Sequence, residues 1–259
     1  MATLTPSGNH PAMEIADVDG VSISGILFDA GLGSPSLLVV GPQGSSGDHS
    51  ANPTALFDLS CRVGGAIPKA QASNCFMINS NDVIMDNVWI WRADHASDTT
   101  WTGWDVNPSD NGITVNGNDV TAYGLFVEHF EKFQTEWNGE RGSTYFYQSE
   151  IPYDVPSQAA WKQPSGENGY PSYKVGENVT THSAKGLGVY SVFSKAANIE
   201  LENAISTPAS PKIDMYNMVT VWIPGQPEQI PTSINHVLNG RGDKADNHTG
   251  PGNPSFLVS

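Results

Sequence analysis

The chain has 259 residues, of which 38% are hydrophobic and 15% are charged, and its formal net charge is −15. This acidity argues against a nucleic-acid partner and against binding to an anionic membrane surface, but it is compatible with a neutral substrate such as a polysaccharide. The 26 glycines and 18 prolines indicate many short strands joined by turns rather than helices. The sequence has no run of 18 apolar residues, so we expect no membrane-spanning segment.

The first twenty residues, MATLTPSGNHPAMEIADVDG, show neither a basic segment nor an apolar core, so no signal peptide is visible. Either the chain is intracellular, or it is a mature or trimmed segment that carries an added Met. Cys61 and Cys75 are the only cysteines, and they form either one disulfide or two buried thiols in successive coils. No His and Cys grouping of the zinc-finger kind occurs, so we expect no structural metal and no cofactor.

Six stretches share one pattern, in which a polar Asn, Asp or Gly corner precedes alternating apolar positions and a further corner follows. In chain order they are residues 17–31, 79–95, 116–130, 141–153, 176–193 and 211–223. Aligning Val83, Val120, Thr144, Val179 and Ile213 gives spacings of 37, 24, 35 and 34 residues. Imperfect repeats of this length are typical of solenoids, in which each coil buries its inner face against its neighbours. We therefore predict an all-β fold, a right-handed parallel β-helix with long corner loops, with Val83, Val120, Val179 and Ile213 in one inward-facing column.

Asparagine recurs at the expected corners, where it tolerates the left-handed conformation and can hydrogen-bond to neighbouring turns of a stack. The residues concerned are Asn79, Asn81, Asn116, Asn118 and Asn178. The alternative is a β-sandwich with a turn every 8 to 12 residues, but the long insertions at 96–113 and 154–175 favour the solenoid. We expect residues 1–238 to form the β-helix and residues 239–259 to form a polar tail or cap.

The segment 128–161 combines carboxylates with aromatic residues. It holds Glu128, Glu131, Glu136, Glu140 and Glu150, together with Trp137, Trp161 and several tyrosines. Such a mixture describes the wall of a carbohydrate cleft, where sugar faces stack on rings and hydroxyls bond to acids. The alternative is an aromatic ladder that fills the solenoid core, with the glutamates on the wet side.

Two short motifs carry a resemblance to a known family. FYQSEIPY at 146–153, followed by GLGVYSVF at 186–193, resembles the Q-x-E-x-P-Y and G-x-G-x-Y-S-F-F segments of glycoside hydrolase family 55. Those enzymes are β-1,3-glucanases, or laminarinases, built from two tandem right-handed β-helices. The resemblance covers most of residues 75 to 235 and implies that this chain corresponds to the second β-helix. It also implies an extracellular protein that acts on β-glucan and pairs with a first β-helix or with a second copy.

Carried over by position, the resemblance makes Glu150 the general acid and Tyr153 the tyrosine three residues after it. Cleavage of a glycosidic bond needs a carboxylic acid that stays protonated near neutral pH. A partly desolvated Glu150 among Tyr145, Tyr147 and Tyr153 would have its neutral form favoured. The family inverts the anomeric configuration, and the groups that hold its attacking water lie largely in the first β-helix. The plain alternative is that Glu150 is an exposed glutamate at a strand end.

The sequence therefore predicts a β-1,3-glucan hydrolase of inverting mechanism, with Glu150 and Tyr153 as catalytic residues. Two other classes stay open, a glucan-binding module without catalysis and a structural or assembly solenoid. The pairs Asp94-His95 and Glu128-His129 end equivalent expected strands and so can line the same cleft. The predicted substrate-binding residues are Asp94, His95, Trp104, Glu128, His129, Trp137, Gln148 and Trp161.

Overall fold

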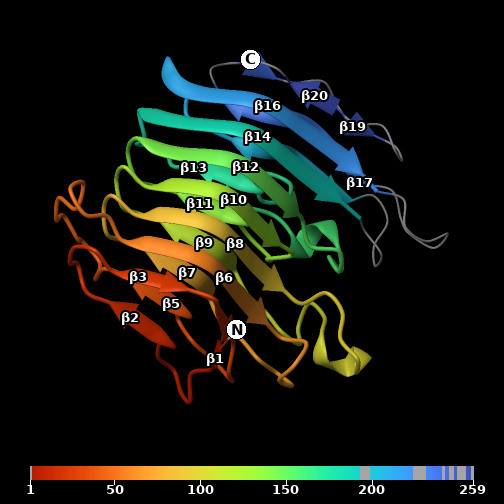
Figure 1. Ribbon diagram of the computed structural model, residues 1–259. Coiled ribbons are helices and arrows are strands. Elements are labelled where there is room, and N and C mark those ends of the chain that lie inside the picture. The colour runs from red at the N-terminus through yellow and green to blue at the C-terminus, as the bar shows by residue number, and fades with distance from the viewer. Residues whose placement is uncertain are drawn as a thin grey trace.

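The computed structural model describes residues 2–192, 199–223, 232–240, 243–244, 248–249 and 255–257. Its strands stack as successive coils, so that the chain climbs along one axis from its N-terminus to its C-terminal end (Figure 1). From β4 to β17, consecutive strands alternate between two sheets, and neighbouring strands within each sheet run parallel through most of the stack. This arrangement is the predicted parallel β-helix.

The first sheet, here called sheet A, has the order β1-β4-β6-β8-β10-β12-β14-β16-β20, with β3 also pairing β6. Its strands are β1 (Ala2–Leu4), β3 (Ser22–Ser24), β4 (Ile26–Asp29), β6 (Ala55–Val63), β8 (Ile84–Arg92), β10 (Thr121–Glu128), β12 (Gly142–Glu150), β14 (Thr181–Ser191), β16 (Lys212–Trp222) and β20 (Ser255–Leu257). The last of these, β20, pairs antiparallel with β16.

The second sheet, sheet B, has the order β18-β17-β15-β13-β11-β9-β7-β5-β2, with β19 also pairing β17. Its strands are β2 (Met13–Ile15), β5 (Leu38–Val40), β7 (Asn74–Ile78), β9 (Asn111–Val115), β11 (Thr135–Trp137), β13 (Tyr173–Val175), β15 (Ile199–Ser206), β17 (Thr232–Gly240), β18 (Asp243–Lys244) and β19 (His248–Thr249). Both β18 and β19 pair antiparallel with β17. Two single 3₁₀ turns, η1 (Thr99–Trp101) and η2 (Gln158–Ala160), lie in the long corner loops.

No helix in the described ranges is long and apolar enough to cross a membrane.

The long strands of sheet A each contain one residue in the left-handed backbone region, and these residues share one register position. They are Asp58, Asn87, Gly124, Phe146, Gly186 and Asn217, with φ between 51° and 73°. Gly, Asn and Asp adopt this conformation at low cost, whereas a bulky apolar side chain rarely does. This column, called here the bend column, therefore contains one exception, Phe146.

The polar corners stack as the sequence predicts. The Asn116 amide donates to Oδ1 of Asn79 at 2.8 Å, and the Asn138 amide donates to Oδ1 of Asn116 at 3.1 Å. In the same corners, the backbone N–H of Asn118 donates to Oδ1 of Asn81 at 2.8 Å. Corner asparagines thus hydrogen-bond from one coil to the next, which satisfies polar groups that the sheets do not reach.

The aligned apolar column is confirmed in part. Val83, Val120 and Ile213 are fully buried and occupy one register position. Between Val120 and Ile213, however, that position is held by Gly142 and His182.

Thr144 and Val179 are the two misaligned residues. Thr144 pairs with Ala122 and Ala184, in the next inward-facing column along the strands. Val179 is buried, but it lies in the corner before β14, where its N–H donates to the carbonyl of Gly176. The alignment of these two residues was wrong because successive corners differ in length.

Trp137 explains why a glycine takes the column position in β12. Its side chain is fully buried, and a Cβ atom placed on Gly142 would lie 2.1 Å from its indole Nε1. The Trp137 ring packs against His182 and Tyr173, with ring centroids 5.0 and 6.2 Å away. An aromatic cluster therefore fills the interior of these coils, which is the alternative stated for this segment.

Cys61 on β6 and Cys75 on β7 form a disulfide. The bond joins sheet A to sheet B across the corner between residues 64 and 73. Of the two alternatives left open by the sequence, the structure shows the bonded one.

Candidate active site

Two carboxyl groups lie side by side at the ends of neighbouring strands of sheet A. Glu128 ends β10 and Glu150 ends β12, and the two residues are direct register partners. Because side chains alternate along a strand, both point outward while Val127 and Ser149 point into the core. Paired carboxyls on one surface are the residue type that proton transfer to a glycosidic oxygen requires.

The Glu128–Glu150 pair is flanked by aromatic residues in the same row. Trp91 on β8 is the register partner of Glu128, and Tyr190 on β14 is the register partner of Glu150. Trp89, two residues before Trp91, stacks on it at a centroid distance of 5.6 Å. The row Trp91, Glu128, Glu150 and Tyr190 therefore combines rings and acids, as a sugar site does.

Glu128 is the member of the pair with the clearer electrostatic perturbation. Burial raises its pKa to about 7, and the nearby charges of Glu150 and Asp94 act in the same direction. Trp89 Nε1 donates to its Oε2 at 3.0 Å, which opposes the shift without cancelling it. Glu128 can therefore gain or lose a proton near neutral pH.

Glu150 is held by two donors. The Tyr153 hydroxyl donates to its Oε2, and the Gln148 amide donates to its Oε1 at 3.2 Å. Burial, and then the bond to Glu150, raise the pKa of Tyr153, so this hydroxyl keeps its proton. Tyr153 thus fixes one carboxylate oxygen of Glu150.

The expected tyrosine environment of Glu150 is only partly present. Tyr147 points into the core, where its hydroxyl contacts Ser172, and Tyr145 stacks on Tyr123 at 5.2 Å in a separate ladder. Alternation from Glu150 alone places Tyr147 inward, and the bend at Phe146 then turns Tyr145 to the outer face. Of the three tyrosines, the contact that the structure shows for Glu150 is the one with Tyr153.

His129 and Asp94 lie close to the carboxyl pair. His129 is almost fully buried, and its Nε2 is 3.5 Å from Asp94 Oδ1 and 3.9 Å from Glu150 Oε2. Burial lowers the pKa of His129, so the ring is neutral near pH 7. Asp94 also accepts from Trp91 Nε1 at 3.2 Å and contacts His95 Nδ1 at 2.9 Å, and His95 lies exposed at the rim.

Arg92 forms hydrogen bonds and ion pairs with several of the segments that carry these residues. Its guanidinium is fully buried and bonds both oxygens of Asp154, at 3.0 and 2.9 Å. It also donates to the carbonyls of Asn107 and His129, each at 3.0 Å, and lies 3.3 Å from Glu131. A buried bidentate pair with these further bonds holds the ends of neighbouring coils in fixed positions.

The structure brings together most of the predicted site residues. Those that meet around the pair are Asp94, His95, Glu128, His129, Gln148, Glu150 and Tyr153. Trp104 is half-buried, and its ring lies 5.8 Å from the Arg92 guanidinium. It therefore packs against Arg92 and lies outside the row of Trp91, Glu128, Glu150 and Tyr190. Trp137 and Trp161 are fully buried, and the indole of Trp161 donates to the carbonyl of Glu131 at 2.9 Å. These two tryptophans face the interior, so the prediction that they converge with Glu150 on one groove was wrong.

Sequence reasoning missed Trp89, Trp91, Arg92, Asp154 and Tyr190. Asp154 directly follows Tyr153, and Arg92 lies within the WRADH stretch that ends a predicted strand. Their proximity to the motifs was a usable signal. That an arginine would be fully buried and paired could not be inferred from strand alternation, which expects charged side chains to face water.

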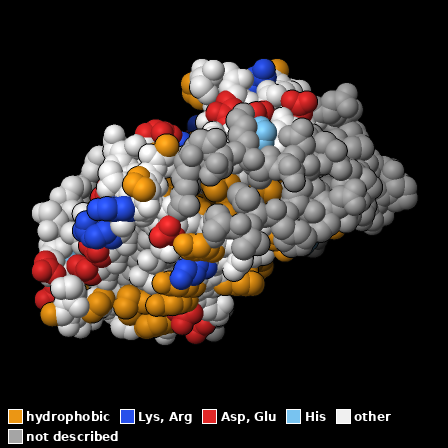
Figure 2. Space-filling model, turned by 90° about the horizontal axis from the view of Figure 1, so that it is seen from above, with side chains coloured by type: hydrophobic (Ala, Val, Ile, Leu, Met, Phe, Trp, Pro, Cys, Tyr) orange, Lys and Arg blue, Asp and Glu red, His pale blue; other side chains and the backbone are white. Residues whose placement is uncertain are grey.

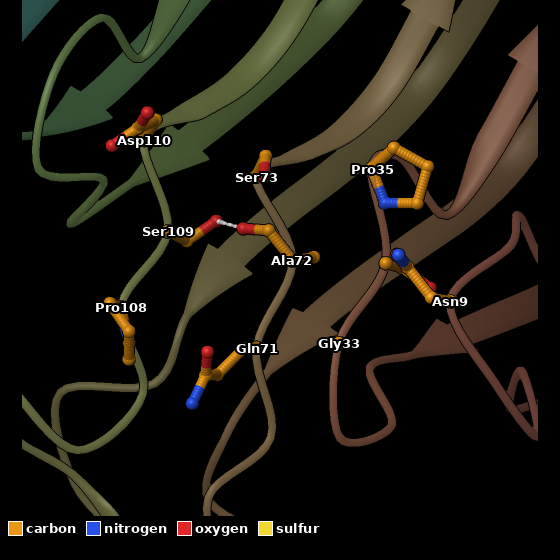
Figure 3. A pocket seen from close by; sticks show the side chains of 10 residues that line it. Asn9, Gly33, Pro35, Gln71, Ala72, Ser73, Pro108, Ser109 and Asp110 are labelled. Atoms are coloured by element: carbon orange, nitrogen blue, oxygen red, sulfur yellow. Dashed lines mark hydrogen bonds between the residues drawn. The ribbon is translucent and has the colours of Figure 1, made fainter.

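A separate concave surface lies where four chain segments precede strands of sheet B (Figure 3). It encloses about 350 Å³, and its polar side chains are Asn9, Ser34, Gln71, Ser73, Ser109 and Asp110. Ser109 donates to the Ala72 carbonyl at 2.6 Å, and Asp110 pairs with Lys132 at 2.8 Å. The lining lacks adjacent carboxyls, so the Glu128–Glu150 pair is the better candidate for chemistry.

In the part of the chain that the structure describes, no group of three or more His, Cys, Asp or Glu is placed to hold a metal ion.

Comparison with known proteins gives consistent matches. The family model described as the LAM55 pectate lyase-like domain matches residues 1–150. An exo-beta-1,3-glucanase of Streptomyces sp. (strain SirexAA-E / ActE) is 42% identical over 260 residues, which is 100% of this chain and 41% of that protein. The solved structure of sacteLam55A from Streptomyces sp. SirexAA-E is 41% identical, with a TM-score of 0.92 over 99% of this chain and 45% of that chain.

A second solved structure is a variant of sacteLam55A, with one glutamate replaced by alanine, in complex with glucose. It is 40% identical to this chain, with the same TM-score of 0.92 and the same coverage of both chains. The chain thus spans less than half the length of the relatives it matches.

Proposed function

The chain belongs to the family of the LAM55 pectate lyase-like domain, and from this premise we propose that it is the acid-bearing part of a β-1,3-glucan hydrolase. The observation that supports this most directly is the Glu128–Glu150 pair, placed side by side on the outer face of sheet A. The similar exo-beta-1,3-glucanase supports β-1,3-glucan as the substrate and removal of sugars from the chain end as the mode of action.

In this proposal, Glu150 delivers the proton to the departing glycosidic oxygen. Neighbouring carboxyls that interact share their protons as a pair. Because the pKa of Glu128 is about 7, the pair retains one proton near neutral pH. Tyr153 and Gln148 orient the Glu150 carboxyl through its two oxygens. The neutral His129 nearby adds no positive charge that would draw the proton away.

The attacking water of an inverting reaction acts on the opposite face of the sugar from the acid. The chain spans 41% of the related glucanase, so we infer that part of the water-binding side lies in the remainder of a longer protein or in a partner chain. The Cys61–Cys75 disulfide supports an extracellular location, since disulfides persist in oxidising compartments.

The experiment is Glu150→Gln in this chain, measured alone and together with the remaining part inferred above. Release of reducing sugar from laminarin should fall about 10²- to 10⁴-fold, the usual contribution of a general acid. A nitrophenyl glucoside should lose less activity, because its leaving oxygen needs little protonation. Glucan binding should stay nearly unchanged, because Gln keeps the shape of Glu.

The matched control is Glu136→Gln. Glu136 is also a partly buried glutamate whose pKa burial raises, but it lies on β11 of sheet B, away from the pair. Its replacement should leave laminarin hydrolysis unchanged. If Glu150→Gln retains full activity on laminarin, Glu150 is an ordinary strand-end residue. If the intact protein binds laminarin but releases no sugar, the function is that of a glucan-binding module.

A further inference from the structure

The strand that carries Tyr190 has glycines at two outer positions, Gly186 and Gly188. A Cβ atom on Gly188 would lie 3.0 Å from Cε2 and 3.2 Å from the hydroxyl oxygen of Tyr190. The hydroxyl end of the Tyr190 ring therefore lies over Gly188, two residues back along β14. An aromatic ring that covers a strand glycine in this way leans along the sheet instead of standing away from it.

Gly186 leaves the sheet surface open beyond that ring. A Cβ atom there would meet one neighbour within 4 Å, the Phe146 Cα at 3.9 Å. Positions 186 and 188 are roughly 7 Å apart along the strand. An uncovered patch thus separates the leaning Tyr190 ring from Phe146, which is the register neighbour of Gly186 in the bend column.

Phe146 occupies the bend column although phenylalanine rarely adopts the left-handed backbone conformation. Its φ is 64°, and its side chain is 59% exposed, the largest exposed fraction among the large aromatic side chains that the structure describes as exposed. The ring touches Phe126 edge-on at 5.8 Å, and Phe126 lies in register between Trp89 and Gln148. Figure 2 shows hydrophobic side chains gathered along one edge of the molecule, with basic side chains among them. A strained residue whose ring faces solvent indicates a role other than stability.

We propose that Tyr190 and Phe146 form a stacking site for a glucose unit of β-glucan, adjacent to the unit held at Glu150. Tyr190 is the register partner of Glu150, so the patch continues the carboxyl row without a break. Phe146 bounds the patch on β12, four residues before Glu150 on the same strand. Aromatic rings beside an open surface at Gly186, which has no side chain, suit the flat, uncharged face of a pyranose.

The identity of the ligand rests on the proposed function, but the test does not depend on hydrolysis. The probe is laminaritriose, and its dissociation constant is measured by calorimetry on the intact protein that carries Glu150→Gln. On this background, Tyr190→Ala should weaken binding roughly 5- to 10-fold, the loss expected for one aromatic stacking contact. Tyr190→Phe should bind as tightly as the background, because the ring and not the hydroxyl is used.

Tyr123→Ala is the matched control, since Tyr123 is an exposed tyrosine of the same sheet whose ring is stacked on Tyr145. It should not change the dissociation constant. Unchanged binding in Tyr190→Ala overturns the proposal, and so does a protein with no measurable binding of the probe. A protein that hydrolyses laminarin normally but shows no effect of Tyr190→Ala keeps the proposed function and loses this site.

Phe146→Asn separates binding from folding. Asn suits the left-handed backbone, as at Asn87 and Asn217 of the same column, so the melting temperature should stay constant or rise by about 2 °C or more. Binding of laminaritriose should nevertheless weaken by a factor similar to that of Tyr190→Ala. Unaltered affinity in a variant that is at least as stable shows that Phe146 takes no part in the site.

Discussion

The chemical character of the site depends on where one proton resides. Glu128 and Glu150 are register neighbours, and Trp89, Gln148 and Tyr153 each donate to one of their oxygens. Two neighbouring carboxyls resist double ionisation, so a single proton stays on the pair to a higher pH than on an isolated glutamate. Burial raises the pKa of Glu128 to about 7, and the charge of Glu150 acts in the same direction.

Glu128→Gln should shift the pH dependence of hydrolysis. In the wild type, activity should decline as the pH rises through about 7, because the pair then loses its proton. With Gln at 128, the group whose pKa is raised to about 7 is absent, so the alkaline limb of kcat/KM on laminarin should move to lower pH. An alkaline limb that stays near 7 would show that another group controls it, and Glu136→Gln serves as the control.

The same substitution has a definite effect on stability. Because the folded-state pKa of Glu128 is raised, the folded protein binds more protons than the unfolded chain between about pH 4.5 and 7. Ionisation of Glu128 therefore lowers the free energy of unfolding as the pH rises through that window. In Glu128→Gln this part of the decline should be absent, which urea unfolding at pH 5 and pH 7 can measure.

At the scale of elements, the loop between β5 and β6 is attached to the solenoid by a histidine held between two carboxylates. His49 Nε2 lies 2.9 Å from Asp17 and Nδ1 lies 2.6 Å from Asp19. Its backbone N–H donates to Asp82 at 2.9 Å, and Ser80 donates to Asp17 at 2.7 Å. The loop therefore bonds to the preceding corner and to the following one.

The Asp19–His49–Asp17 contact should stabilise the protein over a limited pH range. Hydrogen bonds to Asp19 and then Asp17 raise the pKa of His49, so its contribution is complete below about pH 6.5 and is lost as the pH rises through the raised value. Burial opposes ionisation of Asp17, but its bonds from Ser80 and His49 prevail and lower its pKa to about 2. That contribution is complete above about pH 4 and is lost as the pH falls toward 2.

His49→Gln should consequently cost most near pH 5, about 1 kcal/mol for ion pairs whose carboxylates are partly exposed, and less at pH 9. The free energy of unfolding of the wild type and the variant, measured at both pH values, tests this. A cost that is equal at the two values would show that the bonds act without the charge of His49. His10→Gln, at an exposed histidine of the N-terminal segment, is the control for the loss of a histidine as such.

The elements also show how far the sequence could predict this fold and site. The recurring corner asparagines predicted the ladder from Asn79 to Asn116, and the equivalent strand ends predicted that Glu128 would line the same cleft as Glu150. The alignment failed at Val179 because corner length varies, and a pattern of apolar residues does not count corner residues. Trp137 was misplaced because an aromatic residue beside glutamates has the same composition in a cleft and in a packed core, and the deciding clue was a glycine at 142.

At the scale of the whole molecule, each coil of the β-helix rests on its two neighbours, so local stability can differ along the axis. The carboxyl pair belongs to the coils of β10 and β12, in the middle of the stack (Figure 1). The disulfide belongs to an earlier coil and joins β6 to β7. The coils before β6 therefore pack on a cross-linked coil that lies outside the coils of the site.

Removal of the disulfide should loosen one end of the solenoid and leave the site folded. In a Cys61→Ala/Cys75→Ala variant the lost cross-link, which closes a separation of 14 residues, should cost about 3 kcal/mol. Hydrogen exchange measured by mass spectrometry should become faster in β2, β4 and β5, which lie on the N-terminal side of the bond, while β12 and β14 keep their protection. Reducing agent should accelerate exchange of the wild type in the same strands and should not change the variant. Equal acceleration in β14 and β4 would instead show that the solenoid opens as one cooperative unit, and the carboxyl pair would then depend on the disulfide for its geometry.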